Sequence, residues 1–495
     1  MNRDMQQNWP SLLIDPLDDK PREECGVFGV YGLEDAAPLT VLGLHGLQHR
    51  GQEACGIAVY DGAHFHSERH MGLVSDNFAG PDVAKRLPGK AAIGHVRYST
   101  QGETALRNVQ PLYADLKSGG FAVAHNGNLT NARALRETLV TDGAIFQSTS
   151  DTEVVLQLVA RSRRTHLVHR FIDALKKIEG AYALVALTNK KLIGARDPYG
   201  IRPLILGRLN GAPVLASETC ALDMIGAKFE RNIEPGEVVV ITEGGIESHR
   251  PFAKVRPRPC LFEFVYFARP DSIVDGKSVY EVRKRMGQRL AIEHPADVDV
   301  IVPVPDSGVP AALGFAQGAN IPFELGIIRN HYVGRTFIQP SQSVRDMGVR
   351  LKHAANRAVL KDKRVLLVDD SIVRGTTSLK IVRMVREAGA KEVHFRSASP
   401  PIRFPDFYGI DMPDAERLLA ARHAHEEMVK MLEVDSLGFL SVDGLYWAMG
   451  EERRNDDLPA YADHYFTGDY PTRLCDYEQH NSDKAKQLSL LSDVA

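Results

Sequence analysis

The sequence predicts two domains of different construction: a mixed α+β domain over residues 25–255, and an α/β domain with a parallel sheet over residues 256–473. Residues 25–255 hold many short β-prone segments broken by glycine, with helical segments between them. The prolines and charged residues of Lys254–Pro259 are typical of a domain edge. From about residue 280, helices and strands alternate, which indicates a parallel sheet with helices on its faces.

Each element rests on its own pattern of apolar residues. In the first domain, strands are expected at Gly26–Tyr31, Gly56–Tyr60, Ala91–Tyr98, Phe121–His125, Tyr182–Thr188, Lys191–Gly194, Val214–Ser217 and Val238–Thr242. Helices, in which apolar residues recur every three or four positions, are expected there at Pro38–Leu47, Asn131–Thr141, Asp151–Arg161 and His169–Lys177. The second domain is expected to run helix 279–294, strand Val298–Pro303, helix 308–318, strand 324–328, strand Val365–Val368, helix 377–388 and strand Glu392–Ser397. A charged, flexible tail is expected over 474–495.

Composition excludes several classes of protein. The 495 residues are 44% hydrophobic and 25% charged, as in ordinary globular proteins. A formal net charge of −3 argues against a general electrostatic grip on nucleic acid. Since no apolar run is long enough for a membrane span, we expect a cytoplasmic protein that contacts neither membrane nor nucleic acid. Neither a GxGxxG fingerprint nor a Walker A loop occurs.

The cysteines form no recognisable framework. There are five, an odd number, and no two have CxxC spacing, so a disulfide scaffold or zinc ribbon is not expected. Each cysteine is therefore either a small buried residue, which is the default, or a nucleophile.

The clearest functional signal follows the strand at Val365–Val368. Two carboxylates, Asp369 and Asp370, stand at its carboxyl end, and the loop that follows opens a helix. That loop holds Ser371, Arg374, Gly375, Thr376 and Thr377. Backbone N–H groups and hydroxyls at a helix start can hold a phosphate, while the acids suit sugar hydroxyls or Mg²⁺. The alternative is that the acids only favour the helix dipole.

This pattern resembles the phosphoribosylpyrophosphate (PRPP) signature of the type I phosphoribosyltransferases. The resemblance implies that Asp369 and Asp370 bind ribose hydroxyls and Mg²⁺, and that the following loop holds the 5′-phosphate. It also implies that Asp306 and Ser307, at the end of a second strand, contact pyrophosphate. Gly308 stands where a second serine is expected, which argues against a side-chain metal ligand from that loop.

A basic stretch between the two loops includes Arg335 and runs from Arg329 to Arg357. Such a charge run is either a solvated face or a set of partners for pyrophosphate. We interpret it as a mobile lid, over about 329–350, that closes over PRPP.

Cys25 stands out because of the segments that accompany it. Alone, the run Cys25–Val30 would be read as a core strand. Four further segments follow at Gln48–Gln52, Gly94–Thr100, His125–Asn128 and Ser148–Glu153. In order and spacing they resemble the class II glutamine amidotransferase domain. That domain is an N-terminal-nucleophile hydrolase, and the resemblance implies an αββα sandwich.

The resemblance implies a chemistry for this domain. If residues 1–24 are removed as a propeptide, the α-amine of Cys25 can act as the base for its own thiol. The oxyanion would then be held by the Gly127 N–H and the Asn126 side chain.

The same resemblance implies how glutamine is bound. Arg97, assisted by Thr100, pairs with the α-carboxylate of glutamine, and Asp151 pairs with its α-ammonium. His95 and His125 are expected to be structural.

With both halves in one chain, residues 23–473 resemble the glutamine PRPP amidotransferase family. That implies internal passage of ammonia from glutamine to PRPP, yielding 5-phosphoribosylamine, glutamate and pyrophosphate in the first committed step of purine synthesis. It also implies a homo-oligomer, a tetramer, with purine nucleotides as feedback inhibitors. Two alternatives are an amidotransferase with another acceptor and an inactive nucleotide-sensing homologue. The acidic pair argues against the first, and retention of Cys25, Asn126 and Asp369 against the second.

One branch of that family carries a [4Fe–4S] cluster on four cysteines. Here Cys260 occupies the first ligand position, but Asp406, Ala462 and Tyr465 occupy the others. One thiolate cannot hold such a cluster, so we expect none, and expect Cys260 to be a buried apolar residue.

Overall fold

The computed structural model describes residues 25–80, 82–98, 105–330, 353–410, 412 and 414–477. The chain forms two compact units, which are taken in turn. Within the described residues, the N-terminal unit contains 25–282, and two later segments return to it, 404–414 and 454–477. The other unit consists of 283–403 and 415–453.

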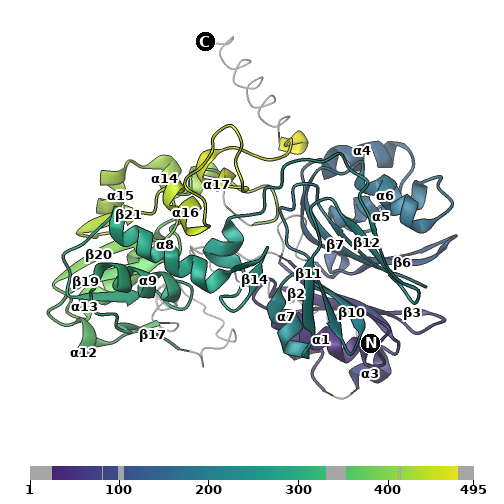
Figure 1. Ribbon diagram of the computed structural model, residues 1–495, viewed down its shortest axis with the longest axis horizontal. Coiled ribbons are helices and arrows are strands. Elements are labelled where there is room, and N and C mark those ends of the chain that lie inside the picture. Colours follow the sequence, from purple (N-terminus) through teal and green to yellow (C-terminus); the bar gives the residue numbers. More distant parts are fainter. Residues whose placement is uncertain are drawn as a thin grey trace, which may run out of the picture. The chain divides into compact units, whose positions relative to one another are not determined.

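Two antiparallel sheets form the middle of the N-terminal unit (Figure 1). The seven-stranded sheet has the order β11 (Lys228–Asn232), β9 (Ile205–Leu209), β10 (Ala212–Ala216), β1 (Gly26–Tyr31), β4 (Ala91–Arg97), β2 (Ala54–Tyr60), β3 (Phe65–Met71). The six-stranded sheet has the order β13 (Gly245–His249), β12 (Val238–Thr242), β8 (Leu192–Arg196), β7 (Gly180–Thr188), β6 (Gly119–Leu129), β5 (Leu112–Leu116). Two short strands, β14 (Ile273–Val274) and β15 (Lys277–Ser278), pair separately.

Helices cover the outer faces of both sheets (Figure 1). The seven-stranded sheet is covered by α1 (Ala36–Gly46), α2 (Val74–Asn77), α3 (Val83–Arg86) and α7 (Thr219–Ile225). The six-stranded sheet is covered by α4 (Ala132–Thr141), α5 (Thr152–Arg161) and α6 (Leu167–Leu175). A third apolar core lies between the sheets. Strand β1 shows why: Val27 joins the core between the sheets, whereas Phe28 and Val30 face the helices, as side chains that alternate along a strand must. The unit is thus the expected αββα sandwich.

The other unit is built on a parallel sheet. Its order is β16 (Val300–Pro303), β19 (Arg364–Asp369), β20 (Glu392–Ser397), β21 (Ser436–Phe439). The helices of this part of the chain are α8 (Val279–Glu293), α9 (Val309–Ala319), α12 (Arg357–Leu360), α13 (Thr376–Glu387), α14 (Leu419–Arg422), α15 (His425–Met431) and α16 (Val442–Ala448). Helix α13 packs on one face of the sheet with α15, and α9 contacts β16 and β19. The alternation of helices and strands therefore predicted the α/β architecture correctly.

One expected strand lies elsewhere. The apolar run at 324–328 was expected to belong to the parallel sheet. Instead, β17 (Ile327–Arg329) pairs antiparallel with β18 (His353–Ala355), and only Phe323 bridges to Ile301 beside β16. The Glu324 N–H still donates to the Ile301 carbonyl at 3.0 Å, whereas Ile327 and Ile328 pair with Ala355 and Ala354.

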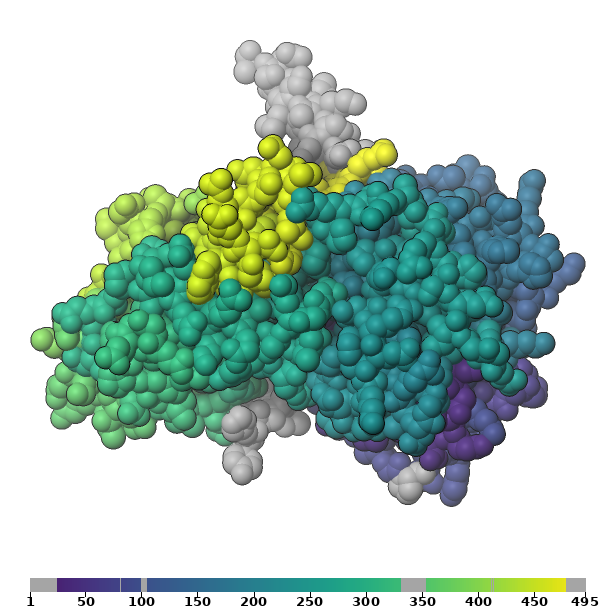
Figure 2. All heavy atoms as spheres, in the orientation of Figure 1, coloured from purple at the N-terminus to yellow at the C-terminus, as the bar shows by residue number. Residues whose placement is uncertain are grey.

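The units also divide at a different place from the expected boundary at 255/256. Residues 256–282 stay with the N-terminal unit, where the N–H groups of Arg258 and Cys260 donate to the carbonyls of Tyr199 and Ile201 at 2.7 and 3.3 Å. Phe262 also packs on Tyr465 and Phe466 of the returning segment, at ring-centroid distances of 5.0 and 6.2 Å. The backbone of Leu261 also donates to Ala462. The returning segment 454–477, which includes α17 (His464–Thr467), is visible in yellow in Figure 2.

The first residues of the expected tail are docked. Both oxygens of Asp476 accept hydrogen bonds from the first N–H groups of α4, those of Arg133 and Ala134, at 2.8 and 3.0 Å. Residues 478–495 lie outside the described ranges. Across those ranges, no helix is both long and apolar enough to cross a bilayer.

Candidate functional site

Cys25 lies immediately before β1, with 8% of its surface exposed. Its Sγ donates to the carbonyl of Tyr98 at 3.5 Å. Burial raises the pKa of this thiol to about 11; Arg97 acts to lower it, whereas Asp151 and Glu53 act to raise it. Because the thiol is protonated at neutral pH, it needs a base before it can attack a substrate.

Sheet pairing places Arg97 beside Cys25. Strand β1 pairs with β4 so that Gly26 lies opposite Val96, and Arg97 is the last residue of β4. Its side chain is buried, at 3% exposure. A guanidinium in this position can form a bidentate pair of hydrogen bonds with a carboxylate. Thr100, its expected assistant, lies outside the described residues.

Asn126 and Gly127 lie on β6, in the sheet that faces β1. Asn126 is fully buried, and within the described part of the chain neither its Oδ1 nor its Nδ2 has a hydrogen-bond partner. Leaving a buried amide unpaired costs about 1–3 kcal/mol, so such a group indicates a site where a ligand supplies the partner. Gly127 has φ +134°, and a Cβ there would lie 2.2 Å from the carbonyl oxygen of Ala181. Only glycine fits this point of the chain.

Asp151 is held beside these residues. Its Oδ2 accepts a hydrogen bond from the Leu129 N–H at 3.0 Å and lies 3.5 Å from Nδ1 of His125. Burial acts to raise the pKa of this carboxyl, but His125 and the Leu129 and Thr152 N–H groups outweigh it and hold the pKa below its ordinary value. Asp151 is therefore an anion that can bind an ammonium group.

The two expected structural histidines are buried within the same hydrogen-bond network. His95 Nε2 lies 3.0 Å from the carbonyl of His125, and burial lowers the pKa of His95 to about 3. His95 is thus neutral and fixed.

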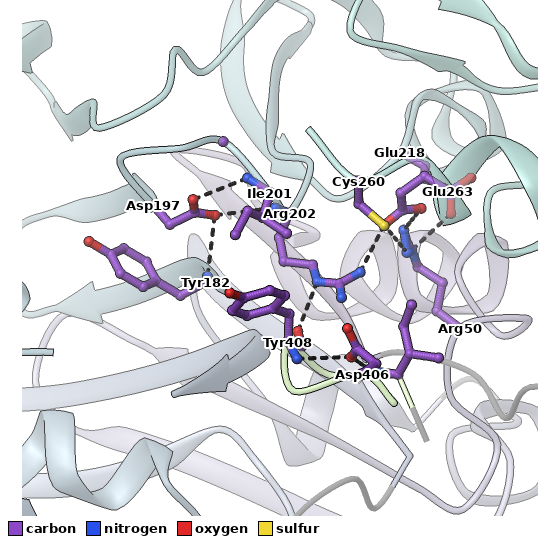
Figure 3. A network of polar contacts seen from close by, with 12 residues as sticks. Arg50, Tyr182, Asp197, Ile201, Arg202, Glu218, Cys260, Glu263, Asp406 and Tyr408 are labelled. Carbon is purple, nitrogen blue, oxygen red and sulfur yellow. Dashed lines mark hydrogen bonds and ion pairs between the residues drawn. The ribbon is translucent and has the colours of Figure 1, made fainter. Parts of the chain in front are cut away.

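An ion-pair network that the sequence argument did not identify supports the start of β1 (Figure 3). Arg50, fully buried, pairs with Glu218 at 2.8 Å and with Glu263 at 2.5 Å. Its Cδ lies 3.4 Å from where a Cβ on Gly26 would stand, so it packs against the residue that follows Cys25. Charged residues within apolar segments indicate buried ion pairs in general. The sequence does not show that Arg50 pairs with Glu263, because the two are 213 positions apart.

Glu218 is committed to this network. In the part of the chain that the structure describes, His49, Glu218 and Cys220 are the one group of three whose ligand atoms could surround a metal. The Glu218 carboxylate, however, already accepts from Arg50, from His49 at 2.7 Å and from Ser272 at 2.7 Å. We therefore interpret this group as part of the buried ion-pair network rather than as a metal site.

The acidic pair lies where the sequence placed it. Asp369 ends β19 and Asp370 follows, each 2% exposed. The Ser371 hydroxyl donates to Asp370 Oδ1 at 2.6 Å, and the Ser307 hydroxyl donates to Asp370 Oδ2. The structure thus brings together the two strand-end loops that the sequence singled out. Two carboxylates with neighbouring hydroxyls form the all-oxygen donor set that Mg²⁺ prefers.

Two further members of the loop, Thr376 and Thr377, are the first residues of α13. Gly375, with φ +80°, precedes that helix, and Arg374 precedes the glycine. The N-terminal end of the helix therefore starts within the loop, as a phosphate cradle requires.

Gly308 allows the second loop to approach the first. A Cβ on Gly308 would lie 2.6 Å from the carbonyl oxygen of Val368 and 3.2 Å from Cα of Asp369. The serine expected there would not fit. Asp306 is half-exposed and pairs with Arg329. Arg335 and the remainder of the expected lid, 331–350, lie outside the described residues.

The four positions of the iron–sulfur branch gather in the N-terminal unit. Cys260 bridges to Ala462, and its Sγ lies 3.0 Å from the Tyr465 hydroxyl. Asp406 Oδ1 lies 2.7 Å from His464 Nε2. Cys260 is buried, as expected, but its surroundings are polar.

Comparison with known proteins agrees with this geometry. A family model described as a glutamine amidotransferase domain matches residues 95–224, and one described as a phosphoribosyl transferase domain matches 271–397. The amidophosphoribosyltransferase of Rhizobium etli is 61% identical over 99% of both chains. That of Bacillus subtilis is 48% identical over 91% of this chain and 95% of its own. The chain belongs to the amidophosphoribosyltransferase family.

A solved structure extends this to the whole fold. The glutamine PRPP amidotransferase from B. subtilis, in complex with ADP and GMP, has a TM-score of 0.85 and 46% identity, covering 91% of this chain and 98% of that one. This amidophosphoribosyltransferase therefore transfers the amide nitrogen of glutamine to PRPP, a step of purine synthesis. The acceptor is PRPP rather than another sugar phosphate or aspartate.

Proposed function

We propose that the two half-reactions of this amidophosphoribosyltransferase are carried by Cys25 in the N-terminal unit and by the Asp369–Asp370 loop in the other. The observation that supports the proposal is the buried side-chain amide of Asn126, which has no hydrogen-bond partner among the described residues. It lies in the sheet that packs against the sheet beginning just after Cys25. The Cys25 thiolate attacks the amide carbonyl of glutamine, and Asn126 with the Gly127 N–H stabilises the oxyanion. Loss of ammonia leaves a thioester, which water hydrolyses to glutamate.

We propose that Arg97 and Thr100 bind the α-carboxylate of glutamine, and that Asp151 binds its α-ammonium. The low pKa of Asp151 supports its part, because a carboxylate that stays ionised can hold the ammonium group.

At the second site, ammonia displaces pyrophosphate from C1 of PRPP. Asp369 and Asp370 accept the ribose hydroxyls, and Ser371, Arg374, Gly375, Thr376 and Thr377 hold the 5′-phosphate. Asp306, Ser307 and Arg335 face pyrophosphate. Asp369 and Asp370 would hold Mg²⁺, which would supply positive charge to the leaving pyrophosphate.

Removing Cys25 separates the two half-reactions. We expect Cys25→Ala to reduce glutamine-dependent synthesis of phosphoribosylamine by about 10⁴-fold or more, because the nucleophile is lost. Synthesis from added ammonia should remain near wild type. Cys475→Ala, a partly exposed cysteine far along the chain, is the control and should change neither. Equal loss of both activities in Cys25→Ala would refute the assignment of the two half-reactions to separate sites.

Changing Asp369 should affect both routes. Asp369→Asn removes one charged acceptor, so we expect kcat/KM for PRPP to fall about 10- to 100-fold with either glutamine or ammonia. Asp297→Asn is the control at the amino ends of the strands, where exposed Asp297 pairs with Arg364, the first residue of β19. It should leave both activities unchanged. Full ammonia-dependent activity in Asp369→Asn would place the sugar elsewhere.

We further propose that residues 1–24 are removed, so that the Cys25 α-amine becomes the base. With the peptide bond to Glu24 intact, the rate of Cys25 alkylation by iodoacetamide should rise about tenfold per pH unit toward the thiol pKa of about 11. In a chain beginning at Cys25, the rise should occur near pH 8, where an α-amine loses its proton. Intact mass identifies the form in each preparation. A fully active enzyme that retains residues 1–24 would contradict the proposal.

We propose that no [4Fe–4S] cluster is bound. The donor set supports this, because Cys260 is the single thiolate and Asp406 is already engaged by His464. Protein purified without oxygen should lack the visible absorption of such a cluster, measured by spectrophotometry, and iron analysis of the same sample should find no stoichiometric iron. Stoichiometric iron would overturn the assignment.

We also propose a cytoplasmic homo-oligomer, a tetramer, inhibited by purine nucleotides. The ADP and GMP in the B. subtilis structure support nucleotide regulation.

A further inference from the structure

A loop from the second half of the chain reaches the strand that carries Asn126 and Gly127. The chain leaves β20 of the parallel sheet, enters the N-terminal unit over residues 404–414, and returns to α14. Its portion Phe404–Ile410, here the 404–410 loop, packs directly on the backbone of Gly127. A Cβ on Gly409 would lie 3.0, 3.1 and 3.3 Å from the carbonyl carbon, Cα and carbonyl oxygen of Gly127.

A hydrogen bond ties the same loop to the next side chain of β6. Asn128 Nδ2 donates to the carbonyl of Phe407 at 2.9 Å. Asn128 is 3% exposed, and its own backbone is paired with β7 opposite Ala181. The loop therefore touches β6 at two consecutive residues, Gly127 and Asn128.

Asp406 shapes the loop from inside. Its Oδ2 accepts the N–H groups of Tyr408 and Ile410 at 2.9 and 2.6 Å, which folds the chain around Gly409. Its Oδ1 contacts His464 Nε2 at 2.7 Å. Burial acts to raise the pKa of Asp406, but His464 outweighs it and keeps the carboxyl ionised. The residue that stands in place of a cluster cysteine thus anchors this turn.

Further bonds fix the rest of the loop. Arg202 Nε donates to the carbonyl of Tyr408 at 3.0 Å, and Figure 3 shows its guanidinium lying between Tyr408 and Cys260. The Tyr470 hydroxyl donates to the carbonyl of Pro405 at 2.8 Å, and the Phe404 N–H donates to Tyr465. Such a densely bonded loop is a rigid support.

We propose that the 404–410 loop is a positioning element for the oxyanion hole: through Gly409 and Asn128 it fixes the direction of the Gly127 N–H and the depth of the Asn126 amide. The inference rests on the proposed function of Asn126 and Gly127. An oxyanion hole acts only if its donors are already in place, and a displacement of about 1 Å at a reacting centre costs on the order of 100-fold in rate. None of the loop residues touches the substrate in this role.

Gly409→Ala tests the contact. The added methyl stands within 3.3 Å of three Gly127 backbone atoms, and φ at Gly409 is +119°. We expect the glutaminase kcat to fall about 10- to 100-fold, with KM for glutamine changed less than about threefold, because ground-state binding uses other residues. Ammonia-dependent synthesis and the rate of Cys25 alkylation by iodoacetamide should match wild type.

Gly245→Ala is the matched control. Gly245 lies in the same unit with φ +125°, and a Cβ there would meet no atom within 4 Å. It reproduces the backbone strain without the contact and should leave glutaminase kcat unchanged. Asn128→Ala removes the bond to Phe407 without adding volume, and it should lower kcat in the same selective way if Gly409→Ala does not fold.

Three results would overturn the inference: a glutaminase loss in Gly409→Ala no larger than in Gly245→Ala, a parallel loss of ammonia-dependent synthesis, or a normal kcat in Asn128→Ala. Failure of the proposed function looks different. If Cys25→Ala keeps its glutaminase, the proposed function itself is wrong. If Cys25→Ala is inactive while Gly409→Ala and Asn128→Ala are normal, only the role of the loop is wrong.

Discussion

The glutaminase site depends on how closely the two antiparallel sheets of the N-terminal unit pack face to face. The core between them is rich in small residues, including Ala58, Ala122, Ala124 and Ala183. At Gly29, a Cβ would lie 2.9 Å from a methyl of Val185 on the opposite sheet. Larger side chains here would push the sheets apart, and the proposed nucleophile, Cys25, immediately precedes β1 of one sheet, while the proposed oxyanion donors, Asn126 and Gly127, belong to the other. The small residues of this core therefore determine how far Cys25 lies from Asn126 and Gly127.

Burial at this interface has two opposite consequences. It keeps the Cys25 thiol protonated, since a thiolate is poorly solvated there, and this creates the need for a base at the residue itself. The same low dielectric would strengthen the buried Asn126 amide in its proposed role as an oxyanion donor. The thiol in such a site therefore does not attack a substrate until a base accepts its proton. That property suits an enzyme whose first product, ammonia, must not be released without an acceptor.

Much of the fold was predictable because it is local. Strands β1, β12 and β20 were predicted to the residue, and the Asp369–Thr377 loop was identified from contiguous sequence. The features that the sequence did not predict depend on contacts between residues far apart in the chain. The run at 324–328 pairs with β18, which no local pattern signals, and Arg50 finds Glu263 across 213 positions. Gly308 was noted as an unexpected residue, but its reason is a backbone approach to Val368 that only the folded chain reveals.

The course of residues 404–414 shows how a sequence boundary can differ from a physical one. Proline-rich and charged residues at 254–259 suggested a single crossing between domains, whereas the chain returns twice to the N-terminal unit. Each return brings groups that the first 282 residues lack: Asp406 and Gly409 in one, His464 and Tyr470 in the other. A glutaminase built only from residues 25–282 would retain Cys25, Asn126 and Gly127, yet it would lack the backing that holds the last of these in place.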